Sequence, residues 1–126
     1  MTQEQLGIQY VTRYEKAHRR KAVNVSREYK GYDVKSGNRY IEVKSRYKSE
    51  IQPFITLNKT LLRTLGKKLV NYYVYAVYDM KRKPKLVIIP PDDIFKNLET
   101  DVSLKIRGKV YNKNKPEILK LIKNKK

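Results

Sequence analysis

The sequence predicts an α/β fold, a single domain in which a central mixed β-sheet is flanked by helices. The chain has 126 residues, which suits one domain with one ordinary core. Amphipathic helical patterns and short β-branched or aromatic runs follow one another along it, an order typical of a sheet with helices packed on its faces. Two of these runs flank Gly37-Asn38, a pair that indicates a tight β-hairpin.

A first helix is predicted over residues 3–20. Thr2 and Gln5 have the spacing of a capping box, and apolar residues then recur at helical spacing to form a core-facing stripe. The stripe consists of Leu6, Tyr10, Val11, Tyr14 and Ala17. We interpret the two acids nearby, Glu4 and Glu15, as solvated surface charges.

The predicted hairpin fixes which residues face each other. With Gly37-Asn38 as the loop, Asp33 lies opposite Glu42 across the ladder. Alternation of side chains then predicts one apolar face and one polar face. The apolar face carries Tyr32, Val34, Ile41 and Val43, and the polar face carries Asp33, Lys35, Tyr40, Glu42 and Lys44.

Two carboxylates about 5 Å apart across a ladder repel each other, so their pairing needs a compensating charge. A divalent cation is one candidate, because Mg²⁺ prefers oxygen ligands and is held by one or two carboxylates plus water and phosphate. Lys44 projects from the same face as Glu42, where an ammonium can stabilise charge on a phosphate. The pattern therefore indicates metal-assisted hydrolysis of a phosphodiester. The alternative is a solvated charge ladder in which Lys35 and Lys44 neutralise the acids.

Asp33 followed by Ile41-Glu42-Val43-Lys44 resembles the signature of the PD-(D/E)XK nuclease superfamily. The longer strings, residues 31–34 and 39–44, are most similar to the NO VEIN C-terminal domain family, with archaeal Holliday-junction resolvases a more distant likeness. The resemblance covers about residues 1–90. It implies a restriction-endonuclease-like core, with Asp33 and Glu42 as ligands of Mg²⁺ or Mn²⁺ and Lys44 as the catalytic lysine.

The chain departs from the resembling family at two acidic positions. Gln9 stands on the first helix where a Glu is usual, and Asn58-Lys59 stands where relatives often have Asn-Glu. We expect Gln9 to act, if at all, as a neutral ligand or water-positioning group. Lys35 and Tyr40 are further accessory candidates, as contacts to the phosphate.

The formal net charge is +18, from 30 Lys and Arg against 12 Asp and Glu, which indicates a polyanionic partner. No stretch approaches 20 apolar residues, so DNA is expected rather than a membrane, with RNA left open. The expected nucleic-acid contacts are Arg46, Lys48, Arg63, Lys67 and Lys68.

The absence of cysteine excludes a thiolate nucleophile and a cysteine zinc site. A cytoplasmic protein follows, and a homodimer is expected because one compact site cuts one strand.

The remaining elements are predicted from shorter patterns. Strands are expected over 22–26, 71–78, 85–89 and 102–106, and a short strand or turn over 54–57. Helices are expected over about 58–65, 91–98 and 115–126. The domain is expected to span residues 1–126, with a basic C-terminal extension from about residue 105. The predicted function is that of a metal-dependent endodeoxyribonuclease, and the alternative is a non-catalytic nucleic-acid-binding module on the same fold.

Overall fold

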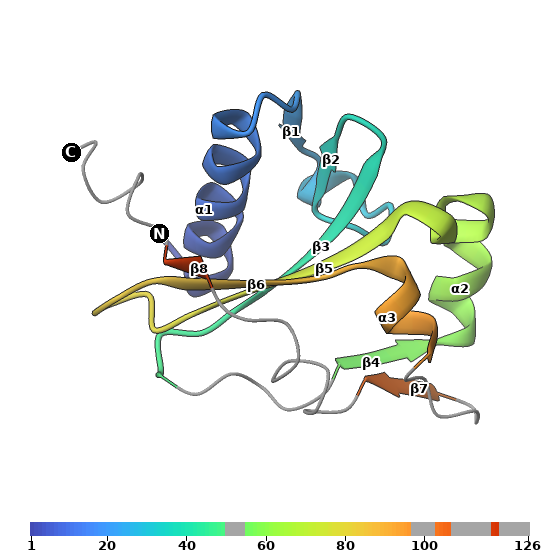
Figure 1. Ribbon diagram of the computed structural model, residues 1–126. Coiled ribbons are helices and arrows are strands. Elements are labelled where there is room, and N and C mark those ends of the chain that lie inside the picture. The colour runs from blue at the N-terminus through green and yellow to red at the C-terminus, as the bar shows by residue number, and fades with distance from the viewer. Residues whose placement is uncertain (50–54, 97–102, 107–116, 119–126) are drawn as a thin grey trace.

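A computed structural model describes residues 1–49, 55–96, 103–106 and 117–118 of the chain (Figure 1). Its centre is a six-stranded mixed sheet in the order β1-β2-β3-β5-β6-β8, in which β3 and β5 are parallel and the other neighbours antiparallel. The strands are β1 (Ala22–Asn24), β2 (Val34–Ser36), β3 (Arg39–Ser45), β5 (Tyr72–Tyr78), β6 (Lys85–Ile89) and β8 (Glu117–Ile118). A separate two-stranded sheet pairs β4 (Ile55–Asn58) with β7 (Ser103–Ile106).

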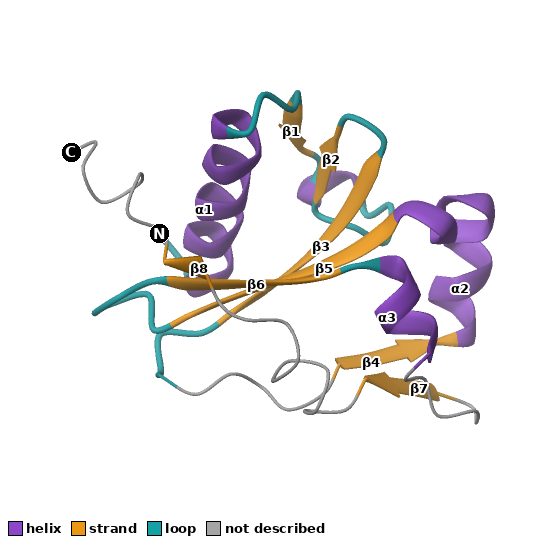
Figure 2. Cartoon of the chain, viewed as in Figure 1, coloured by secondary structure: helices purple, strands orange, loops and turns teal. Residues whose placement is uncertain are grey.

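Helices cover both faces of the central sheet, which confirms the predicted fold class (Figure 2). They are α1 (Gln3–Ala17), α2 (Lys59–Leu65) and α3 (Pro91–Lys96), with 3₁₀ turns η1 (Ser26–Glu28) and η2 (Gly66–Asn71). Between α1 and the sheet lies a first core that includes Val11, Val34, Ile41, Tyr75 and Leu86. A second core on the opposite face includes Tyr32, Leu65, Tyr72, Val74 and Ile94. No helix among the described residues is both long and apolar enough to span a bilayer.

The first helix begins as predicted and is fixed to the sheet at its start. The capping box is present, with the Gln5 N–H donating to the Thr2 hydroxyl at 3.1 Å and the Thr2 N–H to Gln5 Oε1 at 2.9 Å. Gln3 Oε1 accepts a hydrogen bond from the Tyr47 N–H at 2.9 Å, beyond the end of β3. The helix ends at Ala17, three residues before the predicted end.

Glu15 is fully buried at the far end of α1, so its interpretation as a surface charge is wrong. Its carboxylate accepts two hydrogen bonds from Arg20, at 2.6 and 2.7 Å, and one each from Ser36 and Tyr75, both at 2.9 Å. Burial raises the pKa of Glu15, but these hydrogen bonds outweigh it and hold the pKa below its ordinary value. A helix pattern cannot show this, because the partners come from β2, β5 and the segment after α1.

The β2–β3 hairpin has the predicted register, with Val34 opposite Ile41 and Lys35 opposite Tyr40. The regular pairing stops at Val34, however. The Asp33 N–H donates to the Ile41 carbonyl at 2.8 Å, a break in the manner of a β-bulge. A one-residue break turns the side chains that precede it toward the opposite face of the sheet. Tyr32 therefore lies in the second core, and the prediction that it shares a face with Val34 is wrong.

The later elements mostly follow the prediction. β5 and β6 match it, β4 and β7 lie within a residue of it, and β1 is shorter because η1 takes up Ser26. The predicted C-terminal helix is wrong at Glu117–Ile118, which pair instead with the edge of β6, whose backbone groups need partners. Residues 97–98 of the third predicted helix, residues 50–53 of the loop after β3 and nearly all of the basic extension lie outside the described residues.

Gly7 allows the close approach of α1 to β3. A Cβ atom at this position would lie 1.7 Å from Ser45 Oγ and 2.6 Å from Ser45 Cβ. Gly7→Ala is therefore expected to lower the free energy of unfolding by about 1–3 kcal/mol through overpacking, measured by urea denaturation. Ser45→Gly in the same chain should restore most of this loss, and an equal loss with and without Ser45→Gly would contradict the packing argument.

Candidate active site

Asp33 and Glu42 meet at the break in the hairpin. Asp33 directly precedes β2, and its Oδ2 accepts a hydrogen bond from the Val43 N–H at 2.9 Å. Glu42 lies on β3, on the face that carries the second core, and its side chain is 22% exposed. Beyond the effect of burial, the negative charge of Asp33 acts on Glu42 and raises its pKa, so the two carboxyl groups lie close to each other. The sequence prediction that these acids lie together is thus matched by the geometry, although by way of a bulge rather than a regular pair.

Lys44 completes the cluster. Its Nζ lies 3.4 Å from Glu42 Oε2, and its side chain is 40% exposed. The two residues project from the same face because they are two apart on one strand. Asp33, Glu42 and Lys44 therefore form one partly exposed group at the edge of the sheet.

The electrostatics of the cluster show an excess of negative charge. Burial, followed by the negative charge of Asp33, raises the pKa of Glu42 to about 8, and Lys44 offsets this only in part. Near neutral pH Glu42 therefore stays protonated, which reduces its repulsion with Asp33. A bound cation would reduce the same repulsion. The described residues contain no group of three or more metal-ligating side chains. Two carboxylates are nevertheless enough for Mg²⁺, which keeps several of its waters.

Tyr72 is a neighbour of the cluster that the sequence analysis missed. Its side chain is fully buried, and within the described part of the chain its hydroxyl has no hydrogen-bond partner. Burial raises the pKa of Tyr72, and the charges of Glu42 and Asp33 raise it further. The parallel register pairs Glu42 with Val74, so Tyr72 lies two residues away on the same face. Only the pairing of β3 with β5, which no local pattern predicts, could have revealed this.

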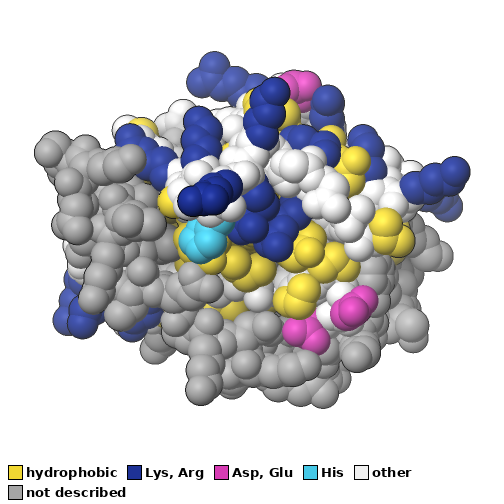
Figure 3. Space-filling view, turned by 45° about the horizontal axis from the view of Figure 1, so that its top comes forward, with side chains coloured by type: hydrophobic (Ala, Val, Ile, Leu, Met, Phe, Trp, Pro, Cys, Tyr) yellow, Lys and Arg dark blue, Asp and Glu magenta, His cyan; other side chains and the backbone are white. Residues whose placement is uncertain are grey.

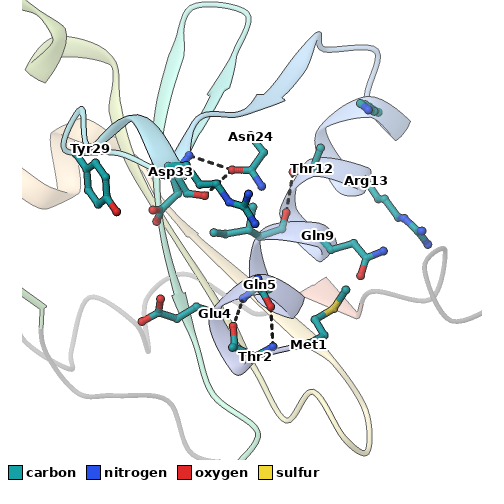
Figure 4. Close-up of a pocket in the computed structure, with 14 residues that line it drawn as sticks. Met1, Thr2, Glu4, Gln5, Gln9, Thr12, Arg13, Asn24, Tyr29 and Asp33 are labelled. Carbon is teal, nitrogen blue, oxygen red and sulfur yellow. Dashed lines mark hydrogen bonds between the residues drawn. The ribbon is translucent and has the colours of Figure 1, made fainter.

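The three accessory candidates are not gathered at the carboxylates. Lys35 donates to the Gly37 carbonyl, and its Nζ lies 4.5 Å from the ring centroid of Tyr40, so the amine is engaged at the turn. Tyr40 shares the face of Glu42 and packs edge-on against Tyr32, with ring centroids 5.0 Å apart. Gln9 points away from Asp33, on the opposite side of α1 (Figure 4).

The five predicted nucleic-acid contacts lie in two separate places. Arg46 and Lys48 follow β3, where their backbones bond to Val77 and Asp79 at the end of β5. Arg63, Lys67 and Lys68 lie on α2 and η2. Lys68 Nζ lies 5.4 and 5.6 Å from the ring centroids of Tyr32 and Tyr40, and Tyr40 is two residues before Glu42 on β3.

Further cations gather at the end of the molecule formed by the last turn of α1 and the β1–β3 strands (Figure 3). They lie beside His18, the single histidine, whose sequence neighbours Lys16, Arg19 and Lys21 have exposed side chains. A basic surface thus covers the end of the molecule at which α1 ends.

A groove of about 830 Å³ runs between α1 and the segment that connects β1 to β2. Asp33 and the exposed ring of Tyr29 lie at one end of this groove. Gln9 and Arg13, both on α1, lie at its other end (Figure 4). Glu4 also lines it, and this acid is solvated as the sequence predicts. The groove gives one carboxylate of the pair direct access to a bound molecule.

The raised pKa of Glu42 predicts a pH-dependent stability. The folded state keeps a proton that the unfolded chain releases above about pH 4.5, so stability falls as pH rises from there to about 8. Glu42→Gln is expected to raise the free energy of unfolding by about 1–3 kcal/mol at pH 8 and to change it little at pH 4.5, measured by urea denaturation. Glu28→Gln, on an exposed side chain, is the control. A gain for Glu42→Gln that is the same at both pH values would contradict the assignment.

The comparisons with known proteins identify one family. The model of one family, described as the C-terminal region of the protein NO VEIN, matches residues 3–89. No curated protein and no solved structure matched the chain. The matched region contains α1, the hairpin with Asp33, Glu42 and Lys44, and the parallel strand β5 that carries Tyr72. The chain therefore belongs to the NO VEIN C-terminal domain family.

Proposed function

We propose that the protein is a metal-dependent endonuclease that hydrolyses phosphodiester bonds of DNA. The observation that carries the proposal is the convergence of Asp33, Glu42 and Lys44, in which burial and Asp33 together raise the pKa of Glu42 to about 8. Two acids and an amine gathered at a partly exposed edge are costly for folding and useful for phosphate chemistry. Membership of the family supports a nuclease-like domain.

Asp33 and Glu42 would hold Mg²⁺ or Mn²⁺, with water and a phosphate oxygen as the other ligands. When bound, the ion supplies Lewis-acid polarisation of the phosphoryl oxygen and lowers the pKa of a coordinated water. Asp33 is already oriented for this role, since the Val43 N–H fixes one of its oxygens. Glu42 would give up its proton to hold the ion, so binding of the ion would be favoured as pH rises.

Lys44 and Tyr72 supply the remaining polar groups. The Lys44 ammonium, 3.4 Å from Glu42, stabilises negative charge that develops on the phosphate. The Tyr72 hydroxyl lacks a partner within the described part of the chain and lies near both acids, so it is suited to position Glu42 or a bound water. Catalysis in this proposal rests on placement and electrostatics, with no covalent intermediate on the protein.

The substrate is proposed to be DNA because the net charge of +18 favours a polyanion and Arg13, Lys16 and Arg27 line the groove that Asp33 also lines. RNA shares the phosphate chemistry. One site cuts one strand, so we propose a two-fold homodimer for any reaction that cuts both strands.

The second candidate is a DNA-binding module without catalysis. It is favoured by Gln9, which replaces an acid on α1 and points away from Asp33 (Figure 4). The basic surface serves both functions equally well, so only a test of turnover separates them.

A plasmid-nicking assay with Mg²⁺ or Mn²⁺ tests the proposal. We expect the wild-type chain to nick DNA, and Asp33→Asn and Lys44→Ala to lower the rate at least about 100-fold, because the first removes a ligand of the ion and the second removes the amine that stabilises charge on the phosphate. Binding in a gel shift should persist in both variants. Lys83→Ala, an exposed cation in the turn between β5 and β6, is the matched control for the loss of one positive charge. If the wild-type chain binds DNA without cutting it, the endonuclease proposal fails and the non-catalytic binding module is retained.

Metal binding is testable without turnover. Mn²⁺ is expected to raise the melting temperature of the wild-type chain. At a Mn²⁺ concentration of one hundred times the Kd, the free energy of unfolding should rise by about 2.7 kcal/mol. Asp33→Asn and Glu42→Gln should remove most of the shift, whereas Glu4→Gln, an exposed acid on α1, should keep it. A shift that survives in both site variants would place the ion elsewhere.

A further inference from the structure

We propose that the groove beside Asp33 holds an unpaired segment of a DNA strand, with one base stacked on the ring of Tyr29. The substrate class would then be DNA that is single-stranded next to the cleaved bond, as in a flap, a branch or a free strand. This inference rests on the proposed function and deepens it, since it names the form of DNA that the same site takes.

The first support is the position of Tyr29. Its side chain is 92% exposed, which makes it the most exposed large hydrophobic side chain in the described part of the chain. Its backbone is in the left-handed region, with φ 52° and ψ 45°, which a bulky residue seldom adopts. Neither feature contributes to packing, and together they hold an aromatic face in solvent at the edge of the groove.

The second support is the way in which Tyr29 is tied to Asp33. The Val25 N–H donates to the Asp33 carbonyl at 2.8 Å, and the Glu28 N–H donates to the Val25 carbonyl at 3.0 Å. Asn24 Oδ1 accepts from both the N–H and the hydroxyl of Ser26, at 3.0 and 2.6 Å. The turn that carries the ring is therefore fixed relative to the carboxylate, as a stacking platform beside a reacting phosphate must be.

The third support is the charge and size of the groove. Arg13, Lys16 and Arg27 line it together with the acids Glu4 and Asp33. Its volume of about 830 Å³ falls within the roughly 300–1,000 Å³ of sites that enclose small molecules, so it can take a nucleotide.

These features favour an unpaired strand over a continuous duplex. Stacking on an aromatic ring needs a free base face, and in a duplex both faces of each base are covered by its neighbours. The cations at the far end of the groove, on α1, would then contact the phosphates that follow the stacked base. No base-reading contact is needed, so the stacking tolerates any sequence.

The test is a binding measurement on the full chain in EDTA, where metal-dependent cleavage does not interfere. Fluorescence anisotropy with a labelled oligonucleotide, as a single strand and as the matched duplex, is expected to show tighter binding of the single strand. Tyr29→Ala should weaken single-strand binding about 5- to 100-fold, the usual effect of losing one stacked base, and leave duplex binding unchanged. Tyr29→Phe, which keeps the ring, should bind like the wild type.

A matched control and a direct readout make the result specific. Val70→Ala removes another exposed apolar side chain, 71% exposed on η2, and should change nothing. A 2-aminopurine base in the oligonucleotide should be quenched on binding to the wild type and not to Tyr29→Ala. Arg13→Ala should weaken single-strand binding and reduce its salt dependence by about one ion.

The outcomes separate this inference from the proposed function. Equal binding of single strand and duplex, or unchanged single-strand binding by Tyr29→Ala, would overturn the inference even if the protein nicks duplex DNA. Tyr29-dependent single-strand binding would support it even if the nicking assay shows no turnover, in which case the endonuclease proposal alone fails.

Discussion

The break in backbone pairing at Asp33 is the feature on which the rest of the site depends. Because the Ile41 carbonyl accepts a hydrogen bond from the Asp33 N–H, Asp33 leaves the ladder, and its carboxylate accepts from the Val43 N–H and lies close enough to Glu42 to raise its pKa. The same break turns Tyr32 into the second core, where it packs against Tyr40. The displacement of this one residue thus determines both the position of Asp33 near Glu42 and the packing of Tyr32 against Tyr40.

The pair of acids is a local cost that the surrounding structure offsets. Lys44 lies 3.4 Å from Glu42, and a backbone N–H stabilises Asp33, yet Glu42 still favours its protonated form. The Tyr72 hydroxyl, buried beside them without a partner in the described residues, adds to the cost. Such strain concentrates where a protein binds or reacts, and it is compensated here by two well-filled cores on the faces of the sheet.

Local patterns were enough to predict much of this fold. The Gly37-Asn38 turn between alternating runs fixed the register of β2 and β3, and Thr2 with Gln5 located the start of α1. Contacts distant in sequence were beyond reach. The burial of Glu15 depends on Tyr75, 60 residues away. The place of Tyr72 depends on the parallel register of β3 and β5, and the strand at Glu117 depends on the open edge of β6.

The attachment of α1 at both ends has a consequence for recognition. Gln3 bonds to the backbone beyond β3, and Glu15 is enclosed by Arg20, Ser36 and Tyr75. The helix that forms one wall of the groove therefore cannot tilt away from the sheet without breaking a buried ionic network. A ligand entering there meets a preorganised wall, so little ordering entropy is lost on the protein side when it binds.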